Sequence, residues 1–170
     1  MTKTILAFLF VTVISSFVVG QPSADTLFTI TYRPSLHNPS QLSVYKDQDG
    51  CKGLFQTINV VDGKIKIDTA TATLSNATYI AYSHFFSTYQ FPGYIDNSLP
   101  DTTKNYVQGF DGITIVGAYY GDTKKLFRFW SPYHDKESMA LFKMTLSDLH
   151  KYFKTNANKK YLKWLKMYAK

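Results

Sequence analysis

The chain has 170 residues and a mass of 19.4 kDa, which is the size of one globular domain. Its hydrophobic content of 45% excludes intrinsic disorder, and its single cysteine excludes a disulfide framework and a zinc site built on several thiolates. The formal net charge is +7. Aromatic residues make up 16%, whereas Glu137 is the only glutamate, so we expect a chain rich in strand and turn.

Residues 1–20 have the pattern of a cleaved signal peptide. Lys3 gives a short positive region, the apolar segment 5–14 follows, and small residues precede a cut after Gly20. No other apolar stretch is long enough to span a bilayer, which takes roughly 20 residues. We therefore expect a secreted, extracellular protein beginning near residue 21.

Two further features fit export. Asn76 lies in an Asn-Ala-Thr sequon and is a candidate glycosylation site. In an oxidising compartment the lone Cys51 is either buried and inert or available for an intermolecular disulfide, which would give a Cys51-linked dimer.

The segment from residue 27 to residue 130 predicts about eight short antiparallel strands. Its runs are rich in β-branched and aromatic residues, with turn signals at Asp62-Gly63, at Gly121-Asp122 and around Asp47-x-Asp49-Gly50. The last of these superficially resembles a calcium loop but lacks the other ligands, so a hairpin turn explains it. The expected strands are 27–32, 42–45, 54–60, 64–68, 71–74, 79–86, 113–119 and 126–130. Such a meander hides its edges most simply by closing into an up-and-down β-barrel.

One or two helices are expected after the last strand. Residues 133–170 contain no Gly or Pro, and four apolar residues recur at helical spacing: Phe142, Leu146, Leu149 and Phe153. Thr145 to Asp148 resembles a capping box, a point at which one helix can end and another begin. Residues 21–155 would then form a barrel domain with a packed helix.

Residues 156–170 predict a basic amphipathic C-terminal helix. Seven lysines and no acid occur in residues 151–170, whereas residues 21–150 are almost neutral. The apolar arc either packs on the body or, with the lysines, binds an anionic membrane or glycan surface. This distribution disfavours nucleic acid as the partner. The candidate surface-binding residues are Lys159, Lys160, Lys163, Trp164, Lys166 and Lys170.

Several segments occur in an order that is typical of a known family: LFTITYRP at 27–34, CKGLF at 51–55, the hairpin at 61–67 and LFRFWSP at 126–132, followed by a helix near 136–153. In these motifs the chain resembles the lipocalin (calycin) family. This resemblance implies a closed barrel that carries a small hydrophobic ligand. The family's early Gly-x-Trp has no counterpart here, and an unrelated β-barrel or an α+β sandwich is the alternative.

The sequence offers little chemistry. None of its four histidines has metal-ligand spacing with another histidine, there is no Gly-x-Ser-x-Gly motif, and no metal or cofactor is expected. A weak catalytic set is His134, Glu137 and Arg128, as in a secreted hydrolase or nuclease. The acidic residues near 136 are also what a helix N-terminus prefers.

The leading hypothesis is therefore a non-enzymatic secreted protein that binds a small hydrophobic or amphipathic ligand inside a β-barrel. Alternating positions of the strands predict Phe55, Tyr82, His84 and Trp130 as ligand-binding residues. The alternative is a defence or adhesion factor that engages anionic membranes or polysaccharides through its C-terminal helix. A small hydrolase is the third hypothesis.

Overall fold

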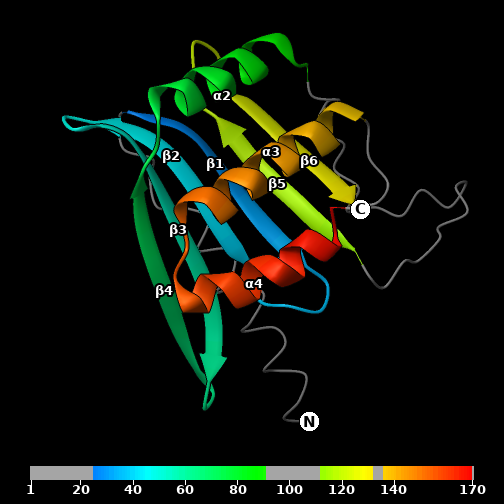
Figure 1. The fold of residues 1–170 in the computed structure, drawn as a ribbon. Helices are drawn as coiled ribbons and strands as arrows, with labels where there is room; N and C mark the ends of the chain where they lie inside the picture. The colour runs from blue at the N-terminus through cyan, green and yellow to red at the C-terminus, as the bar shows by residue number, and fades with distance from the viewer. Residues whose placement is uncertain (1–24, 91–111, 132–135, 170) are drawn as a thin grey trace, which may run out of the picture.

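The computed structural model describes residues 25–90, 112–131 and 136–169, which form six strands and three helices (Figure 1). The predicted signal peptide and His134 lie outside the described residues, as does Lys170. The strands are β1 (Thr26–Pro34), β2 (Ser40–Asp47), β3 (Gly50–Val61), β4 (Lys64–Thr73), β5 (Ile113–Tyr119) and β6 (Lys125–Ser131). The helices are α2 (Asn76–Thr88), α3 (Lys136–Tyr152) and α4 (Asn156–Met167).

The six strands form one antiparallel sheet in the order β4-β3-β2-β1-β5-β6. The prediction of a mainly antiparallel β protein with C-terminal helices is confirmed. The barrel is not observed, because β4 and β6 form opposite edges of the described sheet and do not pair (Figure 1). The arrangement is an open sheet with a layer of helices, the α+β sandwich that the sequence left as an alternative.

The helices pack against one face of the sheet (Figure 1). Phe28 of β1 contacts Tyr82 of α2 at a ring-centroid distance of 4.6 Å, and Tyr32 of β1 contacts Phe142 of α3 at 6.0 Å. Farther along, Phe55 of β3 lies 6.2 Å from Tyr161 of α4. Burial of these aromatic side chains between sheet and helices removes the apolar surface that a barrel was expected to enclose.

Helix α2 replaces the strand predicted at 79–86. Its aromatic residues favour a strand by propensity, but Tyr82 and Phe86 are spaced i, i+4 and both are fully buried against the sheet. Ser75 caps the helix by accepting a hydrogen bond of 3.1 Å from the Thr78 N–H. Tertiary burial and this cap outweigh the β-propensity of the segment.

The two C-terminal helices follow their predicted boundaries closely. All four residues of the predicted apolar stripe are buried, three in α3 and Phe153 directly after it: Phe142, Leu146, Leu149 and Phe153. Helix α3 continues through Thr145, whose hydroxyl donates to the Phe142 carbonyl at 3.0 Å, so the helix does not break there. The two helices are separated by residues 153–155, and the last of these, Thr155, is the N-cap of α4.

Candidate functional site

Helices α3 and α4 form a hairpin whose apolar sides face the sheet. In α4, Leu162 and Leu165 are each 1% exposed, and the Tyr161 hydroxyl donates a hydrogen bond of 3.0 Å to the Asn38 carbonyl. The predicted apolar arc of the C-terminal helix therefore packs on the body. Its lysines stay at the surface, since Lys159, Lys160, Lys163 and Lys166 are exposed.

A groove of about 780 Å³ lies between the solvent-facing sides of α3 and α4. Its lining combines basic and apolar side chains: Lys143, Leu146, Ser147, His150, Lys163, Lys166, Met167 and Ala169. Leu146 is buried, whereas Met167 is 53% exposed. None of the described residues that line the groove is acidic. An apolar floor flanked by cations suits a ligand with a negative group and a hydrocarbon part.

Asp148, which follows the groove residue Ser147 in sequence, forms its hydrogen bond away from the groove, with α2. Asp148 of α3 accepts a hydrogen bond of 2.8 Å from the Tyr82 hydroxyl of α2. Burial raises the pKa of the Asp148 carboxyl above its ordinary value. His150 instead places Nδ1 2.8 Å from the Leu146 carbonyl oxygen, which orients the imidazole on the groove side of the helix.

Two residues of this groove, both on α4, were among the predicted surface-binding residues, but its α3 wall was not predicted. Lys163 and Lys166 line the groove, but Lys159 and Lys160 do not, and Trp164 is half-buried with its ring stacked on His37 at 4.2 Å. The missed wall comes from α3. Its polar members recur at i, i+4 and i+7, a helical stripe beside the buried one that the sequence already contained: Lys143, Ser147 and His150.

The predicted ligand-binding residues do not gather around a cavity. Phe55 and Tyr82 are 1% and 0% exposed and belong to the packed core between sheet and helices. His84, expected in a strand beside the core, is exposed on α2. Trp130 lies in the edge strand β6, opposite Thr114. Of the three described side chains, Phe55 and Tyr82 are buried whereas His84 is exposed, so the structure does not bring them together in one site.

The described members of the predicted catalytic set lie on different faces. Glu137 occupies the first turn of α3, as the helix-terminus interpretation predicts. Arg128 lies in β6 between the buried Phe127 and Phe129, so its exposed side chain projects from the face opposite the helices. The structure therefore does not place Arg128 beside Glu137.

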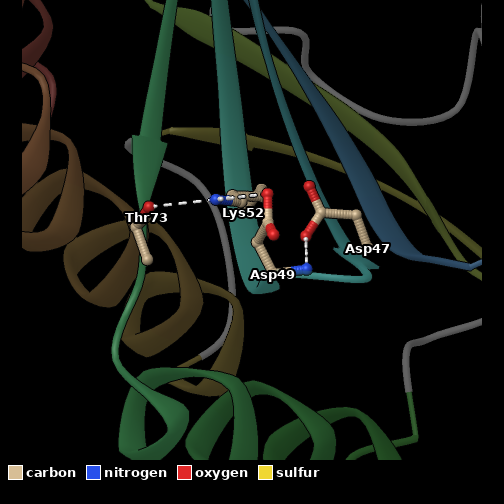
Figure 2. A network of polar contacts seen from close by, with 4 residues as sticks. All are labelled: Asp47, Asp49, Lys52 and Thr73. Atoms are coloured by element: carbon tan, nitrogen blue, oxygen red, sulfur yellow. Dashed lines mark hydrogen bonds and ion pairs between the residues drawn. The ribbon is translucent and has the colours of Figure 1, made fainter.

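The turn between β2 and β3 is held by its own side chains (Figure 2). The Asp47 carboxylate accepts a hydrogen bond of 2.9 Å from the Asp49 N–H, and Gly50 has a φ of 115°. Lys52 Nζ lies 3.9 Å from the Asp49 carboxylate and donates to the Thr73 hydroxyl at 3.2 Å. These contacts occupy the two acids in a hairpin, and no group of three or more potential metal-ligating His, Cys, Asp or Glu occurs among the described residues.

The two predicted modification positions differ in access. Asn76 is exposed as the first residue of α2. Cys51 is free, 6% exposed, and faces the helices, and burial raises the pKa of its thiol. An intermolecular disulfide would require Cys51 to leave the core. Neither glycosylation nor a Cys51-linked dimer is tested by these observations.

A polar cluster that sequence analysis did not identify joins α2 to α3. The Tyr152 hydroxyl lies 3.1 Å from the Thr78 hydroxyl and donates to the Ser75 hydroxyl at 3.3 Å. Hydrogen bonding to Ser75 and Thr78, with Lys151 beside it, lowers the pKa of Tyr152 to about 8. The cluster fixes the start of α2 against the end of α3.

Comparison of the chain with protein-family models, with curated proteins and with solved structures finds no significant match. The lipocalin resemblance is therefore neither supported nor contradicted by relatives and stays a prediction. None of the helices in the described part of the chain is both long and apolar enough to cross a bilayer.

Proposed function

We propose that the protein binds anionic lipid at a membrane surface through the α3–α4 groove. The observation that carries this proposal is the lining of the groove, in which Lys143, Lys163 and Lys166 occur together with the apolar residues Leu146 and Met167, and no acid is present among the described lining residues. The lysines would pair with lipid headgroups while the apolar residues accept the first part of an acyl chain.

Lipid fits this groove better than a polysaccharide or nucleic acid. A polyanion of uniform charge would use the lysines but would leave the exposed Met167 and the adjoining Ala169 without an apolar partner. The described strands form an open sheet and Phe55 is packed in the core, which supports the helix surface over a barrel interior as the ligand site. We therefore propose that an amphipathic ligand binds at the helix surface.

Vesicle flotation tests the proposal. The protein is mixed with vesicles of phosphatidylcholine alone or with phosphatidylglycerol added, at about 0.1 M and at several times that salt concentration. Binding is expected only to the anionic vesicles, and it should weaken as salt rises. The variant Lys143→Gln/Lys163→Gln/Lys166→Gln should lose most of this binding, because each lysine near an anionic surface contributes about 1 kcal/mol.

The matched control removes the same charge elsewhere. Lys46, Lys124 and Lys136 are exposed and outside the groove, so replacing them with Gln should preserve most vesicle binding. Equal losses in both triple variants would show a general effect of net charge and would contradict the groove assignment. Binding to dextran sulfate without binding to anionic vesicles would replace lipid by a polyanion as the ligand.

A further inference from the structure

Strand β4 forms a long edge of the described sheet. Among the described elements it pairs only with β3, through ten residue pairs from Val61↔Lys64 to Lys52↔Thr73. Four large apolar residues of the β3–β4 hairpin are exposed: Val60 at 42%, Val61 at 52%, Ile65 at 45% and Ile67 at 38%. An edge of this length with exposed apolar side chains is a template for another strand.

The hairpin turn determines which backbone groups of β4 are free. Asp62 and Gly63 have φ of 51° and 73°, as a two-residue type I′ turn requires. In such a turn the flanking residues Val61 and Lys64 form a hydrogen-bonded pair, so the N–H and C=O groups of Lys64 point toward β3. Alternation along the strand then directs the N–H and C=O groups of Ile65, Ile67 and Thr69 away from β3, toward solvent.

The charges of β4 are arranged for a second copy of the same strand. Lys66 Nζ lies 3.2 Å from the Asp68 carboxylate, which also accepts a hydrogen bond of 2.8 Å from Asn59. In an antiparallel β4–β4 pair with its two-fold axis at Ile67, Lys66 of each copy stands opposite Asp68 of the other. The same register places Ile67 against Ile67 and Ile65 against Thr69.

Neighbouring symmetric registers are disfavoured by charge. Moving the axis one residue toward the turn places Lys66 opposite Lys66, a repulsion that offsets part of the gain from the two Lys64–Asp68 pairs of that register. Moving it one residue the other way places Asp68 opposite Asp68. Moving it two residues toward the turn places Lys64 opposite Lys66. We propose that β4 is a homodimerisation edge at which two copies of this chain join antiparallel about Ile67 into one continuous sheet.

Such a pairing would also cover apolar surface. Ile58 and Val60 of β3 lie opposite Ile67 and Ile65 in the ladder, so these four side chains share the face of the sheet away from the helices. Pairing across the two-fold axis brings the two sets together on that face. The Lys66–Asp68 pairs then lie on the other face, where alternation also places Lys64 opposite Ala70 of the second copy.

Analytical ultracentrifugation of the full protein with charge-swapped variants tests this register. The wild-type chain should show a reversible monomer–dimer equilibrium over about a hundredfold range of concentration. Lys66→Asp and Asp68→Lys should each weaken association about tenfold, because symmetry changes two cross-strand pairs at once. The double variant Lys66→Asp/Asp68→Lys should restore dimerisation, whereas Lys64→Asp, opposite Ala70, should change it little.

The restored double variant also guards against misfolding as an explanation, since a chain that dimerises again has folded. A monomeric wild-type chain at every concentration would overturn the proposal. So would a dimer that is insensitive to both single reversals, because it would use another surface.

Discussion

Tyr82 and Asp148 form a hydrogen bond of 2.8 Å that joins α2 to α3 beside the core. The tyrosine is 0% exposed and the carboxylate is half-buried, so this polar contact helps to fix how the two helices lie on the sheet. Its aromatic ring packs at the same time on Phe28 of β1. One residue thus couples sheet, α2 and α3, and the ionisation of its partner should affect stability.

We expect Asp148 to make the protein less stable as pH rises. Burial raises the pKa of its carboxyl, so the folded state binds this proton more tightly than the unfolded state. The free energy of unfolding therefore falls as pH rises from about 4, the ordinary carboxyl pKa, through the raised value. Asp148→Asn keeps an acceptor for Tyr82 and should remove this part of the pH dependence, measured by urea unfolding at several pH values.

If the unfolding free energies of Asp148→Asn and the wild type changed in parallel with pH, the Asp148 carboxyl would have the same pKa in the folded and the unfolded state, which would contradict this prediction.

The local patterns of the fold could be predicted from the sequence, whereas the contacts between distant segments could not. The Asp62-Gly63 turn and the apolar stripe of α3 are local patterns, and both were predicted correctly. Whether β4 and β6 meet depends on contacts far apart in sequence, and helices cover the sheet face that closure would have hidden. The lysines on the α4 side of the groove could be predicted from the basic composition of the C-terminal segment. The α3 side could not, because it depends on how α3 packs against α4.

Tyr152 should ionise before the buried tyrosines Tyr32 and Tyr82. Hydrogen bonds from its neighbours lower its pKa to about 8, whereas burial raises the pKa of Tyr82 and Tyr32. A spectrophotometric titration should therefore show one tyrosinate forming near that pH, and Tyr152→Phe should abolish this early step. The control Tyr119→Phe should retain it, because burial raises the pKa of the Tyr119 hydroxyl. An early step that survives Tyr152→Phe would assign the low pKa to another tyrosine.

Gly117 in β5 is expected to resist substitution. A Cβ atom there would overlap the ring of Phe127 and stand 2.5 Å from the Thr29 carbonyl oxygen, which belongs to the paired strand and cannot move freely. Gly117→Ala should lower the free energy of unfolding by about 1–3 kcal/mol through overpacking. At Gly53 the nearest atom is the far end of the Phe153 ring at 3.0 Å, so Gly53→Ala should cost less. Equal losses in urea unfolding would contradict this ranking.

The C-terminal helix should be part of the folding unit and not an appendage. Leu162 is 1% exposed against the core, so Leu162→Ala should lower the unfolding free energy by about 2–5 kcal/mol. Met167 on the same helix is 53% exposed, and Met167→Ala should change stability by less than about 0.5 kcal/mol. Thermal and urea unfolding measure both.

If Leu162→Ala were as mild as Met167→Ala, α4 would not be docked in solution, and removal of residues 156–170 would become a fair test of lipid binding. With α4 docked, truncation destroys the core and the groove together, and only surface changes such as those of the lysines can separate binding from folding.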